Sequence, residues 1–212
     1  KLFVFFFTAA EIVDKIVGDV RRDGDEAVIK YTKLIYRTEF TPEEFVVTEA
    51  EYEAAYQEAD PAVVESLRKA AENVRRYHQE QKPNSWMTYR DKGSILGQSV
   101  IPLDRVGIYV PGGTAAYPSS VIMNAMPAVV AGVKEIIMMV PPKNGKINPY
   151  VLVAAKEAGV SKIFKIGGAQ AIAAMAFGTE TIPRVDKITG PGNIFVTLAK
   201  KAVYGHCDID ML

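Results

Sequence analysis

The 212-residue sequence has few of the side chains that usually build metal centres or covalent crosslinks. Cys207 is its only cysteine, and His78 and His206 are its only histidines. One thiol cannot close a disulfide within the chain or supply a cysteine cluster for zinc. Cys207 is therefore expected to be a small, partly buried residue of a reducing compartment. His78 lies in a charged helical stretch and His206 in a polar loop, so both are expected at the surface.

The chain also has no net charge and no long apolar run. Lys plus Arg and Asp plus Glu number 25 each, so no general attraction to nucleic acid or to a membrane surface is expected. The most apolar stretch, residues 2–7, is much shorter than the roughly 20 residues that span a bilayer, and it is expected to form a short buried or pairing strand. The charge is unevenly spread: residues 1–104 carry an excess of acidic side chains and residues 105–212 an equal excess of basic ones.

Several motifs with fixed spacing are missing as well. No Gly-Lys-Ser/Thr marks a P-loop, and no H-x-x-H, C-x-x-C or G-x-S-x-G pattern occurs. The dinucleotide fingerprint G-x-G-x-x-G is absent, and no acidic residue follows the second strand predicted in the C-terminal half. No side chain stands out as a general base. The sequence therefore predicts neither a catalytic residue nor a metal ligand within this chain.

The first half of the sequence is predicted to be mostly helical. Two Thr-x-x-Glu segments, beginning at Thr8 and Thr48, have the spacing of capping boxes ahead of helices. Pro61 suits the first turn of a further helix. A short strand is predicted over residues 45–47, and a hairpin of two strands over residues 86–100 with a turn at its centre.

From about residue 105 the pattern changes to alternating strands and helices. Four strands, each followed by a helix, are predicted over residues 106–110, 136–140, 163–166 and 185–189. This alternation indicates a parallel sheet with helices on both faces. The predicted fold class is α/β: a helical N-terminal segment with a small β-hairpin, then a Rossmann-like parallel sheet that lacks the usual G-x-G-x-x-G. We place the boundary between residues 1–103, the mostly helical segment, and residues 104–212, the Rossmann-like domain.

Three of the four predicted strands end at glycine, within two residues of the strand. These glycine loops are Gly112-Gly113, Gly167-Gly168 and Gly190-x-Gly192. In an open parallel sheet, the loops at the carboxyl ends of the strands form the ligand crevice. Glycine allows close backbone approach there, and the helix that follows directs free N–H groups at an anion. A tight turn would explain one such loop, but three on one edge favour a nucleotide-like ligand.

Polar side chains among these glycines can give the directional hydrogen bonds that a ribose, an amide or a phosphate needs. Tyr109 ends the first strand, and Gln170 and Asn193 follow the second and third glycine loops. Helix capping is an alternative role that suits Asn193 but not Gln170. Tyr109 could equally be a packed aromatic with a solvated hydroxyl. Further candidates are Thr114, Tyr117, Ser119, Ser120 and Asn124.

Long segments of the second half resemble histidinol dehydrogenases, in the family's order and with similar spacing. They are Arg105-Val-Gly-Ile-Tyr-Val-Pro-Gly-Gly113, Tyr117-Pro-Ser-Ser-Val-Ile-Met-Asn-Ala125, Gly167-Gly-Ala-Gln-Ala-Ile-Ala-Ala174, Phe177-Gly-Thr-Glu-Thr181 and Val185-Asp-Lys-Ile-Thr-Gly-Pro-Gly-Asn193. Upstream, residues 20–27 and 78–98 also look like that family. The resemblance covers about residues 11–210.

The resemblance implies an enzyme of histidine biosynthesis that oxidises L-histidinol to L-histidine through the aldehyde, using two NAD molecules in turn. It also implies zinc, a homodimer at full length and a cytoplasmic location. By residue match, Tyr109, Gln170 and Asn193 would contact NAD, on the edge that the glycine loops indicate independently. The cofactor-binding candidates are therefore Tyr109, Gln170, Asn193, Gly112, Gly113, Gly168 and Gly192.

Members of the family are about twice as long as this chain. The zinc ligands and the Glu–His acid/base pair that the resemblance implies are therefore expected outside these 212 residues. Residues 1–103 are expected to be part of a larger domain, and the chain alone is predicted to be inactive. The alternative hypothesis is a stand-alone nucleotide-binding or interaction module without catalysis.

Overall fold

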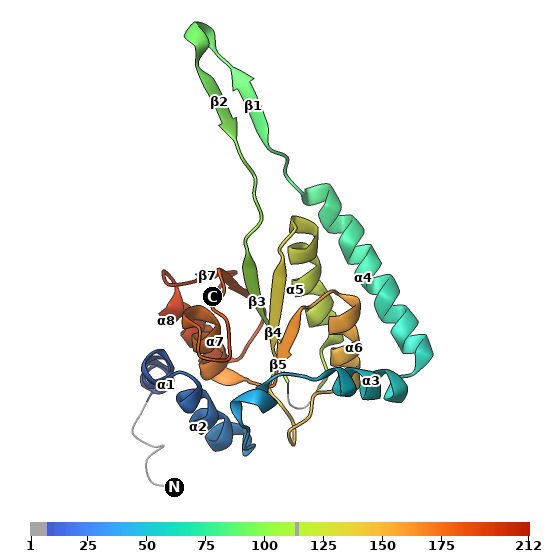
Figure 1. The fold of residues 1–212 in the computed structure, drawn as a ribbon, viewed down its shortest axis with the longest axis vertical. Helices are drawn as coiled ribbons and strands as arrows, with labels where there is room; N and C mark the ends of the chain where they lie inside the picture. The colour runs from blue at the N-terminus through green and yellow to red at the C-terminus, as the bar shows by residue number, and fades with distance from the viewer. Residues whose placement is uncertain (1–7, 113–114) are drawn as a thin grey trace.

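The computed structural model describes residues 8–112 and 115–212, and a parallel five-stranded sheet lies at its centre (Figure 1). The strand order is β5-β4-β3-β6-β7. The strands are β3 (Arg105–Tyr109), β4 (Glu135–Met139), β5 (Lys162–Phe164), β6 (Lys187–Thr189) and β7 (Asp208–Ile209). The predicted α/β fold class is confirmed. The order reverses at β3, which gives the kind of switch point where doubly wound sheets bind ligands.

Helices cover both faces of this sheet (Figure 1). One face carries α1 (Ala9–Asp23), α2 (Asp25–Tyr36), α7 (Gly168–Phe177) and α8 (Ile194–Val203). The other face carries α3 (Glu49–Glu58), α4 (Pro61–Gln81), α5 (Pro118–Ala131) and α6 (Pro149–Glu157). Successive side chains of a strand point to opposite faces. Ile137 and Met139 of β4 therefore join the first apolar cluster, and Ile136 and Met138 join the second.

The helices of the first half begin where the capping boxes predict. The hydroxyls of Thr8 and Thr48 accept hydrogen bonds from the amides of Glu11 and Glu51, at 3.3 Å in each case. The two carboxylates in turn accept hydrogen bonds from the threonine amides. These helices then pack on those of the second half, α1 against α7 and α8, and α4 against α5 and α6. The division into domains at residues 103 and 104 stays a prediction.

Two short strands differ from the sequence prediction. The strand expected over residues 45–47 is wrong in all but one residue, because only Val46 forms a β-bridge, with Phe164. Pro42–Phe45 form a 3-10 helix instead, begun by a hydrogen bond from the Thr41 amide to the Glu44 carboxylate at 2.7 Å. Strand β7 is not among the strands that the sequence predicts. The strand expected over residues 2–7 lies outside the described residues, as do Gly113 and Thr114.

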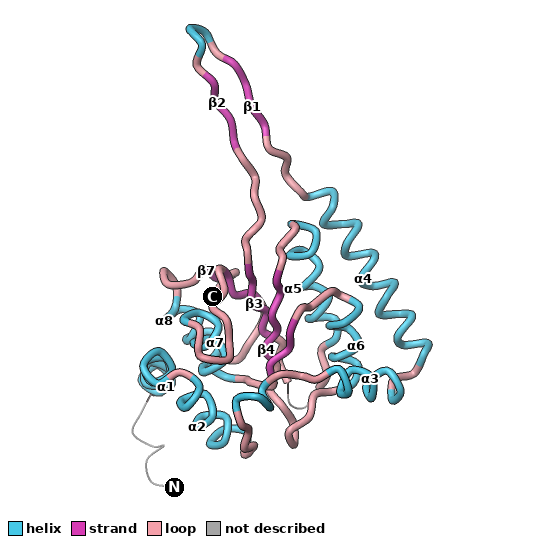
Figure 2. Tube along the Cα trace, in the orientation of Figure 1, coloured by secondary structure: helices cyan, strands magenta, loops and turns pink. Residues whose placement is uncertain are grey.

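The predicted hairpin projects from the body as a long arm (Figures 1 and 2). Its strands are β1 (Trp86–Tyr89) and β2 (Ile95–Gln98), paired antiparallel with Trp86 opposite Gln98. The indole nitrogen of Trp86 donates to the Gln98 side chain at 3.2 Å. Most side chains of both strands are exposed. In the part of the chain that the structure describes, no helix is long and apolar enough to cross a membrane.

Candidate functional site

The predicted glycine loops meet at the carboxyl edge of the sheet (Figure 1). The chain enters β3 from the hairpin, so this edge lies on the side of the sheet away from the hairpin. Gly112 follows β3 and lies against Pro141, which follows β4; a Cβ at Gly112 would be only 2.6 Å from the Pro141 carbonyl oxygen. Gly190 follows β6 with a φ of +118°, and a Cβ there would collide with the Tyr109 carbonyl. Close packing of backbone on backbone thus explains why these positions are glycine.

Tyr109 connects this edge to the helix that follows β5. Its ring is buried, and its hydroxyl accepts a hydrogen bond from the Gly168 amide at 3.1 Å. The Tyr36 hydroxyl, at the end of α2, lies beside it, and a Cβ at Gly167 would be 2.5 Å from that oxygen. Burial raises the pKa of both phenols, so both stay protonated at neutral pH. The alternative prediction of a packed aromatic is therefore right for the Tyr109 ring. The Tyr109 hydroxyl is not solvated, because it is hydrogen-bonded to the Gly168 amide.

Gln170 lies in the first turn of α7 and is completely buried. Neither its amide nitrogen nor its amide oxygen has a hydrogen-bond partner among the described residues. Its Oε1 lies next to the Gly168 backbone, which has a φ of +72°. An unsatisfied buried polar group costs about 1 to 3 kcal/mol. The donor and the acceptor of the Gln170 amide are therefore not used by any described residue.

Asn193 is the N-cap of α8, as the capping alternative predicts. Its Oδ1 accepts hydrogen bonds from the amides of Phe195 at 3.1 Å and Val196 at 3.2 Å. The preceding Gly192 lies directly against the Val196 side chain. Capping occupies only the oxygen of the side-chain amide, so the exposed Asn193 can still donate through Nδ2 to a ligand.

A cavity of about 390 Å³ opens between the loops that follow β3 and β4. Gly112 and Pro141 line it together with Lys143 and Lys146, and the N-terminal end of α6 forms another wall. Glu58 is the acidic residue in its lining. Two lysines and a helix N-terminus favour an anionic group such as a phosphate.

Two charged side chains that the sequence did not single out for this edge hold the Gly190 loop. Lys200 of α8 is 4% exposed, and its Nζ donates to the Gly190 carbonyl at 3.1 Å and pairs with Asp210. Asp210 accepts hydrogen bonds from the amides of Gly190 and Met211, both at 2.8 Å. Burial acts to raise the pKa of Asp210, but the hydrogen bonds from Lys200, Gly190 and Met211 lower it overall. No local pattern in the sequence predicts these contacts.

Histidine and cysteine side chains take no part in this edge. His78 is partly exposed on α4, with Nδ1 2.8 Å from the Gln81 side-chain oxygen, and His206 is exposed with its ring against Phe177. Cys207 is buried, and burial raises the pKa of its thiol to about 11. Within residues 8–112 and 115–212, no group of three or more His, Cys, Asp and Glu side chains could hold a metal ion.

The strand order and the glycine edge define the chain as a Rossmann-like α/β protein, and comparison with known proteins gives its family. A histidinol dehydrogenase family model matches residues 6–212. The histidinol dehydrogenase of Carboxydothermus hydrogenoformans is 57% identical over 200 residues, which are 94% of this chain and 47% of the relative. That of Clostridium acetobutylicum is 56% identical over 198 residues, or 93% and 46% of the two chains.

Solved structures agree with the sequence comparison. The crystal structure of histidinol dehydrogenase from Elizabethkingia anophelis matches with a TM-score of 0.91 at 37% identity, and covers 97% of this chain and 47% of that one. The chain belongs to the histidinol dehydrogenase family. It spans about half the length of the curated relatives it matches.

Proposed function

We propose that this chain forms the NAD-binding part of a histidinol dehydrogenase, an oxidoreductase of histidine biosynthesis. The proposed reaction takes L-histidinol to L-histidine through the aldehyde with two NAD molecules in turn, in an enzyme that is a homodimer at full length. Family membership supports the activity. The observation that carries the cofactor assignment is the buried amide of Gln170, which has no partner among the described residues and lies at the glycine edge.

Tyr109, Gln170 and Asn193 are the proposed NAD contacts. Gln170 supplies a donor and an acceptor that no other described residue uses, and Asn193 has Nδ2 left beside its capping oxygen. NAD, when bound, accepts the hydride that leaves the substrate. The proposed cofactor-binding glycines at this edge are Gly112, Gly168, Gly192 and, in the loop outside the described residues, Gly113.

Zinc does not fit the described residues, because they contain no suitable cluster of His, Cys, Asp and Glu side chains. By resemblance to the family, we expect the zinc ligands and the acid/base residues in the part of its members that this chain does not match. On that basis, we expect the 212 residues alone to bind NAD without turning over L-histidinol.

Calorimetric titration with NAD tests the cofactor assignment through Gln170→Met, which keeps the side-chain length and removes the amide. We expect NAD affinity to fall at least about tenfold, the effect of one or two lost hydrogen bonds. The free energy of unfolding should stay equal or rise by about 1 kcal/mol, because a buried unsatisfied amide is removed.

Thr32→Val is the matched control. Thr32 is fully buried in α2, and its hydroxyl also has no partner among the described residues. This variant should share the gain in stability and bind NAD like the unsubstituted chain. If Gln170→Met also binds NAD with unchanged affinity, the amide is not a ligand contact and the assignment is wrong.

A further inference from the structure

The ion pair of Lys200 and Asp210 binds both polar groups of one residue, Gly190. The ammonium donates to the Gly190 carbonyl oxygen and the carboxylate accepts from the Gly190 amide. Lys200 is almost fully buried, and Asp210 is partly buried. Removing ions from water costs several kcal/mol each, and buried pairs often add little net stability. A role in fixing the backbone of Gly190 therefore explains this pair better than a role in stability.

Gly190 is the point where the ends of β6 and β3 meet. Its backbone lies so close to the Tyr109 carbonyl that a side chain would collide with it. The Tyr109 hydroxyl in turn accepts a hydrogen bond from the Gly168 amide. In the other direction, Pro191 and Gly192 lead directly to Asn193, the cap of α8. A shift of Gly190 would therefore move Asn193 relative to Tyr109 and Gly168.

We propose that Lys200 and Asp210 are positioning residues for the nucleotide. They hold Gly190 against Tyr109 and so set the separation between Tyr109 and Asn193, two of the proposed NAD contacts. This inference rests on the proposed function. It assigns no contact with NAD to either charged residue, because both act through the backbone of Gly190.

A purely structural role would be to attach the last strand to the sheet, and the chain contains a pair that does only this. Lys187 on β6 and Asp208 on β7 form an ion pair at 2.6 Å, with side chains 33% and 54% exposed. This pair joins the same two strands and makes no hydrogen bond to Gly190. Substitutions in it are therefore matched controls for the inference.

The experiment compares Lys200→Met and Asp210→Asn with Lys187→Met and Asp208→Asn in the 212-residue chain. NAD affinity is measured by calorimetry at a temperature where thermal unfolding shows every variant to be folded. The amide resonance of Gly190 is followed by NMR in the absence of NAD. We expect the first two variants to bind NAD about tenfold more weakly, the effect of losing a charge-assisted hydrogen bond, and to shift the Gly190 resonance.

The controls should bind NAD within about twofold of the unsubstituted chain, a difference below 0.5 kcal/mol. Asp210→Asn keeps the side-chain shape, so it covers the case in which Lys200→Met does not fold. Unchanged NAD affinity in folded Asp210→Asn would overturn the inference, and so would an equal loss in the control variants. If the unsubstituted chain does not bind NAD, the proposed function itself is wrong, and this inference fails with it.

Discussion

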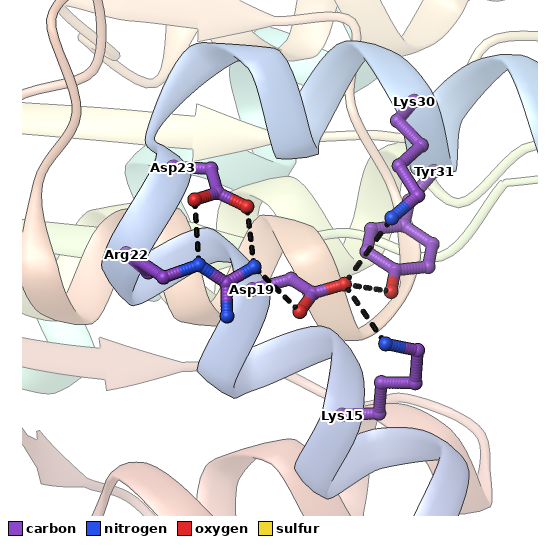
Figure 3. Close-up of polar contacts among 6 residues, drawn as sticks. All are labelled: Lys15, Asp19, Arg22, Asp23, Lys30 and Tyr31. Carbon is purple, nitrogen blue, oxygen red and sulfur yellow. Dashed lines mark hydrogen bonds and ion pairs between the residues drawn. The ribbon is translucent and has the colours of Figure 1, made fainter.

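Asp19 lies at the centre of a network of polar contacts away from the glycine edge (Figure 3). It is buried on α1, accepts a hydrogen bond from the Tyr31 hydroxyl at 2.6 Å, and pairs with Lys30, Arg22 and Lys15. The Tyr31 hydrogen bond is the largest cause that lowers the pKa of Asp19, and the three cations add to it against the opposing effect of burial. The network links α1 to α2.

Asp19→Asn should lower the free energy of unfolding at pH 7 by about 1 to 3 kcal/mol, since a charged acceptor is lost. The pKa is depressed in the folded state, so the carboxylate stabilises fully above its unfolded pKa of about 3.9 and progressively less below it. The difference between the two proteins should therefore shrink as the pH falls below about 4. Urea unfolding of both proteins between pH 3 and pH 7 measures this difference in the free energy of unfolding. Asp14→Asn, at an exposed position of the same helix, should have little effect, and a pH-independent loss in Asp19→Asn would contradict the explanation.

The sequence predicts some roles of single residues and misses others for a physical reason. The cap formed by Asn193 depends on neighbours two and three residues away, so its residue type and position suffice. The isolation of the Gln170 amide and the pairing of Lys200 with Asp210 depend on which elements pack together. Tyr36 reaches Tyr109 only because α2 lies on the same face as α7. These contacts become visible only in three dimensions.

Among the helices and strands, the sequence predicts the longer elements and misses the shortest ones. The long helices have apolar stripes and capping residues, and the predicted strands of the sheet have runs of buried residues. The two-residue strand β7 has no period to detect, and it exists because the Asp208 amide donates to the Asp186 carbonyl next to β6. Over residues 45–47, the capped 3-10 helix after Thr41 prevails over the β-branched residues.

The hairpin arm should contribute little to the stability of the body. Trp86 on β1 is 54% exposed, whereas Met138 on β4 is completely buried. Trp86→Ala should change the free energy of unfolding by less than about 0.5 kcal/mol, as is usual for surface positions. Met138→Ala should lower it by about 2 to 5 kcal/mol through lost burial and a cavity. Urea unfolding followed by far-UV circular dichroism measures both, and a large loss in Trp86→Ala would show that the arm is packed in solution.

For the molecule as a whole, the packing of the helices bears on how the two halves of the chain fold. Val28 and Phe45, from the first half, are fully buried in the same apolar cluster as Ile172 and Ile188, from the second. Residues 104–212 alone would expose that surface to water. We therefore expect the 212-residue chain to unfold in a single cooperative transition, and residues 104–212 alone to lack the near-UV circular dichroism of a packed core. A cooperative transition in residues 104–212 alone would instead support the predicted domain boundary and show that α1 to α4 are dispensable for the sheet.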